Sequence, residues 1–169
     1  MDLEKLIYVI VGAIIGFALS LAKDWLMESK KNKIKRAIYR NERLEELYVL
    51  VGNWSNKLLG NSLSLLSVMH NKIHYNDYYD IVMDSSQERT YDFNRLEMIL
   101  NIYAPELKDI YHNVIQARGN LNDIEGKHKQ SYTRGNMDGR AFVNDYIKAQ
   151  DTFENEIKIL QENIAKLCV

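Results

Sequence analysis

The chain has 169 residues with a net charge of −1 at pH 7, and its single cysteine, Cys168, excludes an internal disulfide. A lone cysteine is consistent with a reducing compartment. Beyond Arg43 there are 13 basic and 18 acidic residues, whereas nucleic-acid binding requires a clustered basic face. We therefore expect no direct nucleic-acid partner. The single proline and a composition rich in helix formers predict an all-α fold.

An apolar run at residues 6–22 is the clearest signal near the N-terminus. Its 17 residues include no charged side chain, and Lys5 and Lys23 flank it. A helix of this length would span roughly 25 Å, the short end of what crosses the hydrocarbon core of a bilayer. Trp25 lies just after the run, at the position where the aromatic side chains of membrane helices usually lie among the lipid headgroups. The sequence therefore predicts an N-terminal transmembrane helix, with residues 1–27 as the anchor.

Three other interpretations of this run compete with the anchor. Residues 20–22, Ser-Leu-Ala, resemble the cleavage site of a signal peptide, although Asp2 and Glu4 stand where such a signal carries positive charge. The run could also be a buried core helix, but such helices are usually amphipathic. A helix lying flat in the membrane interface would need a polar face, which this run lacks.

A basic collar, defined as residues 28–43, follows the anchor with seven basic and two acidic residues. Lys and Arg next to a membrane span stay on the cytoplasmic side. We therefore expect a single-pass protein of the bacterial inner membrane, with its N-terminus outside and its C-terminal domain in the cytoplasm. Basic residues here would contact anionic lipid headgroups and, in an oligomer, line a pore mouth. The residues predicted for this role are Lys23, Lys30, Lys31, Lys33, Lys35 and Arg36.

Residues 44–169 predict a cytosolic antiparallel helical bundle. We expect a first helix continuous with the anchor, a connection with about one helical turn at residues 75–86, a second helix at 86–103, and a third from Pro105. A loop is expected at residues 131–139, followed by a last, strongly periodic helix.

A heptad seam of apolar residues marks the first helix of this bundle. It could pair with another subunit or form the core of the bundle. The residues at the seam positions are Ala37, Leu44, Leu47, Val51, Trp54, Leu58, Leu65 and Val68, with Asn61 as a polar exception.

Three small residues, Gly12, Gly16 and Ser20, recur every four residues within the apolar run. Small residues on one face of a membrane helix let two backbones approach closely. Glycine is also common in membrane helices without any such role. This spacing favours an oligomerisation face, so the expected partners are membrane lipid and further copies of the chain.

No strong catalytic or metal-binding motif is present. His70 and His74 have a spacing that can bind zinc on a helix, but no third ligand is evident, and we expect two solvent-facing histidines. Arg118 and His128 are a possible divergent polar site on or near one helix. The sequence has no phosphate-binding loop and no Gly-x-Ser-x-Gly motif. We therefore expect no cofactor, no metal and no enzymatic activity.

The layout of a membrane helix, a basic collar and a helical bundle of about 130 residues resembles that of the small membrane accessory proteins of type VI-B RNA-targeting CRISPR systems. The resemblance covers the whole chain in layout and includes no diagnostic motif. It implies a divergent HEPN helical fold assembled as a ring at the membrane. In HEPN ribonucleases an arginine precedes the catalytic histidine by four to six residues, and none of the 4 histidines here has an arginine at that spacing. The resemblance therefore implies action at the membrane rather than RNA cleavage.

Together these features favour a self-associating inner-membrane protein that perturbs or permeabilises the membrane in antiviral, CRISPR-associated defence. The alternative is a passive anchor or scaffold whose bundle recruits a cytosolic partner, such as a protein of a defence complex. A membrane-tethered nuclease that uses Arg118 and His128 is a third hypothesis.

Overall fold

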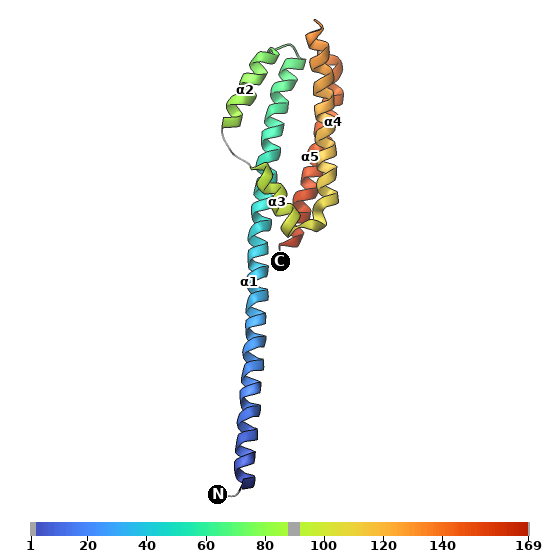
Figure 1. The fold of residues 1–169 in the computed structure, drawn as a ribbon. Coiled ribbons are helices and arrows are strands. Elements are labelled where there is room, and N and C mark those ends of the chain that lie inside the picture. Colours follow the sequence, from blue (N-terminus) through green and yellow to red (C-terminus); the bar gives the residue numbers. More distant parts are fainter. Residues whose placement is uncertain (1–2, 88–91, 169) are drawn as a thin grey trace. The chain divides into compact units, whose positions relative to one another are not determined.

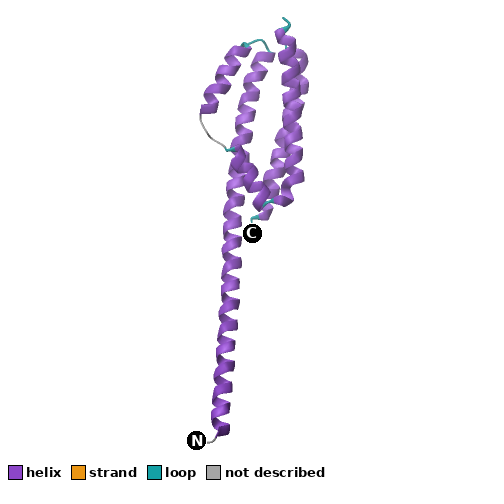
Figure 2. Cartoon of the chain, in the orientation of Figure 1, coloured by secondary structure: helices purple, strands orange, loops and turns teal. Residues whose placement is uncertain are grey.

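The computed structural model describes residues 3–87 and 92–168, and leaves the side chains of residues 1–15, 18–19, 21–22, 85–91 and 169 undescribed. Within the described ranges every regular element is helical, as Figure 2 shows, which confirms the predicted all-α fold class. The chain divides into two compact units, Met1–Arg40 and Asn41–Val169, so the boundary falls inside the predicted collar. Among the described residues, no helix combines the length and the apolar character needed to cross a membrane.

The first helix, α1 (Leu3–Met69), supplies the whole regular structure of the first unit and the opening helix of the second (Figure 1). The second unit continues with α2, α3, a short 3-10 turn, α4 and α5. Their bounds are Tyr75–Gln87, Phe93–Tyr103, Pro105–Leu107, Lys108–Thr133 and Arg140–Leu167.

The core of the second unit is built on the heptad seam of α1. From Leu44 to Val68 its seam positions are buried, with Leu58 partly so. The seam is therefore the core stripe of the bundle within one chain, while Ala37, in the first unit, is exposed. The last helix, α5, contributes its own periodic apolar face to the same core. These residues are Val143, Tyr146, Phe153, Ile157, Leu160 and Ile164.

The helix α2 corrects the sequence prediction, which placed only about one helical turn at residues 75–86. Its 13 residues are helical because an apolar stripe is present among the Asn and Asp residues. Tyr75 and Tyr78 are buried, and Tyr79 and Val82 pack partly against the core. This is the i, i+3, i+4, i+7 pattern of an amphipathic helix.

The predicted second helix begins later than expected, at Phe93. Asp92 caps it, since its carboxylate accepts a hydrogen bond from the backbone N–H of Arg95 at 3.0 Å. The side chain of Arg95 forms an ion pair with Glu46 of α1, which attaches α3 to the first bundle helix. The helix ends at Tyr103, two residues before Pro105, as predicted.

The connection between α4 and α5 is shorter than the predicted loop, because α4 continues to Thr133. Gly135, with φ of 94°, reverses the chain, and its N–H donates to the carbonyl of Tyr132 at 3.0 Å. At the end of the loop the N–H of Gly139 donates to the carbonyl of Met69 at 3.1 Å. This bond joins the start of α5 to the end of α1.

Replacing Gly139 by alanine is expected to destabilise the second unit. An added Cβ would lie 2.4 Å from Nε2 of His128 and 2.7 Å from Cα of Met69. Overpacking of this kind costs about 1–3 kcal/mol. Urea unfolding of the full chain in detergent, followed by far-UV circular dichroism, measures the loss.

The matched control for this prediction is Gly126→Ala in the middle of α4. A Cβ at Gly126 would meet nothing within 4 Å, so the substitution should raise stability by about 0.5–1 kcal/mol through helix propensity. Equal changes in the two variants would contradict the close approach at Gly139.

Candidate functional site

A pocket of about 70 Å³, partly open to solvent, is lined by residues of α1, α2, α4 and α5. Polar groups are costly in a protein interior unless they are paired, so a pocket with a polar lining is a candidate binding site. Its polar lining residues are Asn61, Ser62, Tyr78, Arg118, Asn122, Glu125 and Tyr146.

Two hydrogen-bonded connections form part of the wall of this pocket. The hydroxyl of Tyr146 donates to Oγ of Ser62 at 3.0 Å, and Ser62 donates to the carbonyl of Leu58 at 3.0 Å. On the other side, the hydroxyl of Tyr78 donates to Oε1 of Glu125 at 3.3 Å. Burial raises the pKa of Tyr146 to about 12, so its hydroxyl remains a donor. The bonds tie α5 to α1 and α2 to α4 around the pocket.

The guanidinium of Arg118 lies beside two aromatic rings. Its Cζ is 5.8 Å from the ring centroid of Trp54 and 5.8 Å from that of Phe93, within reach of a cation–π interaction. Its Nε is buried and makes no hydrogen bond. Across residues 3–87 and 92–168 no carboxylate forms an ion pair with Arg118. The guanidinium is therefore held by two rings that do not line the pocket, rather than by an acid.

Glu125 is the acidic group of the pocket. Burial raises the pKa of its carboxyl, and the hydrogen bond from Tyr78 and the charge of Lys129 oppose that shift without cancelling it. Glu125 is two turns along α4 from Arg118, roughly 10 Å along the helix axis. The two residues therefore lie on one face of α4, and in the described part of the chain their side chains form no ion pair with each other.

The second residue of the predicted polar pair, His128, lies outside this pocket. It follows Arg118 by ten positions, roughly 15 Å along the axis of α4. Its side chain is fully buried, its Nδ1 shares a hydrogen bond of 2.9 Å with the hydroxyl of Tyr75, and burial lowers its pKa. The structure therefore does not bring Arg118 and His128 together in one site.

The histidines with zinc-like spacing are not on one helix, because α1 ends at Met69. His70 and His74 are both exposed, which confirms that they face solvent. Nδ1 of His74 lies 2.9 Å from the hydroxyl of Tyr132. In the described part of the chain, no group of three or more His, Cys, Asp or Glu residues is arranged to hold a metal ion.

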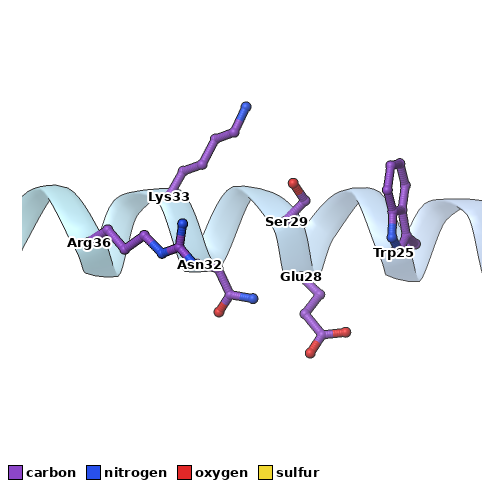
Figure 3. A pocket seen from close by; sticks show the side chains of 6 residues that line it. All are labelled: Trp25, Glu28, Ser29, Asn32, Lys33 and Arg36. Atoms are coloured by element: carbon purple, nitrogen blue, oxygen red, sulfur yellow. The ribbon is translucent and has the colours of Figure 1, made fainter.

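The predicted headgroup and pore-mouth residues, Lys23 to Arg36, are all exposed. At 3.6 residues per turn they occur on every side of α1 rather than in one patch. A shallow groove of about 330 Å³ runs along one face of this segment. Figure 3 shows that Trp25, Ser29 and Lys33 extend to one side of the helix and that Glu28 extends to the other. The segment is a collar around the helix and not a closed site.

The predicted oligomerisation face is described only in part. Gly12 lies outside the residues whose surroundings the structure describes. Gly16 and Ser20 are exposed, and a Cβ at Gly16 would meet nothing within 4 Å.

Sequence reasoning missed most of the pocket, although a signal was present. Arg118, Asn122 and Glu125 have the i, i+4, i+7 spacing of one helix face, and Asn61 interrupts the apolar seam of α1. Polar residues on the face of α4 and within the apolar seam of α1 indicate a shared polar site, once the two helices are known to pack against each other. The contributions of Tyr78 and Tyr146 had no such signal.

Comparison of the chain with protein families, curated proteins and solved structures finds no match.

Replacing Glu125 by glutamine is expected to raise the free energy of unfolding at pH 7. The folded state raises the pKa of this carboxyl above its ordinary value of 4.5. The contribution of the carboxyl to the free energy of unfolding is therefore fully present below pH 4.5 and is lost as the pH rises through the folded-state pKa. The neutral amide avoids burying a charge. Urea unfolding of both proteins from pH 4 to pH 8 measures the difference.

This difference between the two proteins should grow with pH and vanish at the acid end of the series. Glu162→Gln, at an exposed position of α5, is the matched control and should change little. A constant difference at all pH values would show that Glu125 acts through packing and not through its charge.

Proposed function

We propose that the chain is a single-pass, membrane-anchored protein that holds its helical bundle at the cytoplasmic face of a bacterial inner membrane and has no enzymatic activity. The membrane, not a soluble substrate, is the partner that defines this function. The observation that carries the proposal is the distribution of exposed apolar side chains around the first unit.

Four large apolar side chains near the end of the predicted anchor are exposed. Phe17 is 67% exposed, Trp25 70%, Leu26 53% and Met27 49%. At about 100° per residue, the last three lie about 80°, 180° and 280° around the helix from Phe17. Apolar groups on four sides cannot all be covered by one protein surface. A bilayer surrounds a helix and covers all of them at once.

The collar supports the same proposal. Positive charges that encircle α1 immediately after these apolar residues fit the cytoplasmic headgroup layer, which surrounds a spanning helix on every side. The second unit has its own buried core and therefore needs no bilayer to fold. The absence of catalytic activity is proposed because Arg118 and His128 do not share a site.

A charge in the centre of the apolar run should release the chain from the membrane. Ile14→Lys adds about 2.5–3.5 kcal/mol to the cost of insertion, so carbonate extraction of membranes should leave the wild-type chain in the pellet and move the variant to the supernatant. The same substitution at Ile147, an exposed residue of α5, should have no effect. A wild-type chain that is fully extracted would contradict the anchor, as would a C-terminal reporter active only in the periplasm.

Self-association with permeabilisation of the membrane is the second candidate function. The specific observation that favours it is that Gly16 and Ser20, one turn apart, are exposed and leave space for a neighbouring backbone. The antiviral setting of this candidate rests on the resemblance to the CRISPR accessory proteins described above.

Replacing Gly16 by leucine should prevent this assembly. A bulky side chain in a tight helix contact costs about 1–3 kcal/mol at each interface, and a ring repeats that loss at every subunit boundary. Cross-linking in membranes measures assembly, and a potential-sensitive dye measures depolarisation in cells under phage challenge. Gly60→Leu, at an exposed position of the second unit, is the control.

The assembly and the depolarisation should both be lost in Gly16→Leu and kept in the control. If the wild-type chain never depolarises cells, permeabilisation is wrong and the chain is an anchor or scaffold that recruits a cytosolic partner.

A further inference from the structure

His128 is a titratable side chain buried at one end of the bundle, where the end of α1, the start of α2, α4 and the start of α5 meet. It is 0% exposed. Its ring centroid lies 5.4 Å from that of Tyr75, 6.3 Å from that of Tyr132 and 5.5 Å from that of Phe142. The backbone of Gly139 covers another side of the ring, since a Cβ there would lie 2.4 Å from Nε2 of His128. The ring is therefore enclosed by three aromatic side chains and a backbone segment.

The two ring nitrogens of His128 have different surroundings. Nδ1 shares a hydrogen bond of 2.9 Å with the hydroxyl of Tyr75, whereas Nε2 is buried and makes no hydrogen bond. Protonation of the ring makes both nitrogens donors. The hydroxyl oxygen of Tyr75 can accept from Nδ1, so the contact with α2 survives protonation. The charged N–H at Nε2 would instead lie against Gly139 without an acceptor, which is unfavourable in a protein interior.

No carboxylate forms an ion pair or a hydrogen bond with His128 in the part of the chain that the structure describes. Tyr75 of α2 and Tyr132 of α4 present phenol rings to it. Met69 of α1 and Phe142 of α5 are apolar. The other titratable groups near this junction have partners elsewhere or face solvent. They are Glu125 with Tyr78, Lys129 with Tyr79, Asp138 with Arg140, and the exposed His70, Lys72, His74, Asp77 and Arg134.

The connection between α4 and α5 is the part of the junction that can move at least cost. Residues 133–138 are exposed, so their displacement uncovers little apolar surface. Gly139 is attached to α1 by its N–H, which donates to the carbonyl of Met69 at 3.1 Å. Further along α5, the hydroxyl of Tyr146 donates to Ser62 of α1 at 3.0 Å and holds the rest of the helix. Release of the connection would therefore bring water to Nε2 without unfolding the helices beneath it.

We propose that this junction is a pH-sensitive latch, in which protonation of His128 releases the α4–α5 connection from the end of α1 while the rest of the bundle stays folded. Burial lowers the pKa of His128 below its ordinary value of 6.5. The stability that the neutral ring contributes is therefore fully present above pH 6.5 and is lost as the pH falls through the folded-state pKa. Every residue of the latch belongs to the second unit, so the proposal does not rest on the membrane anchor.

The experiment is hydrogen exchange of the full chain in neutral detergent at pH 7.5 and pH 5.5, with single amides resolved by NMR and rates corrected for the intrinsic effect of pH. The amides of Gly139 and Phe142 report the latch, because they donate to Met69 and to Gly139. Uptake of one proton on opening limits the change between these pH values to about tenfold. We expect the protection of both amides to fall about three- to tenfold, while that of Trp54 in the core stays unchanged.

His128→Gln cannot take up a proton in this range, so the protection of Gly139 should no longer depend on pH. The matched control is His74→Gln, an exposed histidine whose Nδ1 lies 2.9 Å from the hydroxyl of Tyr132, and it should behave like the wild type. Because a substitution at a fully buried position can unfold the bundle, a second measurement uses the wild-type chain. An NMR titration of the His128 ring should have the same midpoint as the loss of protection at Gly139.

Three results would overturn the proposal. An equal loss of protection at Gly139 and Trp54 would show that acid unfolds the whole bundle. The same pH dependence in His128→Gln as in the wild type, or its loss in His74→Gln, would assign the proton to another group. A His128 ring that titrates with no change in exchange at Gly139 would show that the protonated ring is accommodated with the connection closed.

Discussion

The packing of Trp54 is the interaction on which the bundle depends. This side chain is 1% exposed, and its ring centroid lies 5.5 Å from that of Phe93 and 5.8 Å from that of Phe153, in edge-to-face geometry. With Arg118 against the same ring, one side chain joins α1 to α3, α4 and α5. Each aromatic pair contributes about 0.5–1.5 kcal/mol beyond the area buried. Arg118 also lines the pocket, so the core and the candidate site share this residue.

The fold was predictable where one periodic face carried enough apolar residues. The seam of α1 and the face of α5 were identified because burial requires Leu, Ile, Val and aromatic residues at spacings of three and four. The helix α2 was missed because Tyr75 and Tyr78 bury polar-tipped rings among Asn and Asp residues, which favour turns in isolation. The end of α4 was misplaced because Ser131 to Thr133 belong to a helix that packing extends beyond its local propensity.

The candidate site was less predictable, since its residues come from four helices. Arg118 was recognised, but it was paired with His128 by proximity in sequence, and the rise of the helix separates them. The residues that line the pocket together with Arg118 include Asn61 and Tyr146, which are separated from it by long stretches of chain. Only the packing of α1 and α5 against α4 brings them together. Sequence patterns define the faces of single helices, whereas a site between helices depends on which faces meet.

The use of the heptad seam limits how the chain can assemble. A seam that spanned two subunits would leave Leu44, Val51 and Leu65 exposed in a single chain, yet each of them is 0% exposed here. Burying each of these side chains contributes about 1.5–3 kcal/mol. This free energy stabilises the fold of the second unit and therefore cannot also drive oligomerisation. Any association between copies has to come from the first unit or from the exposed side chains of the bundle.

Because the first unit carries exposed apolar groups on several sides and the bundle buries its own core, the two units are suited to different surroundings. The proposed anchoring does not depend on the pocket, since no residue of the pocket belongs to the first unit.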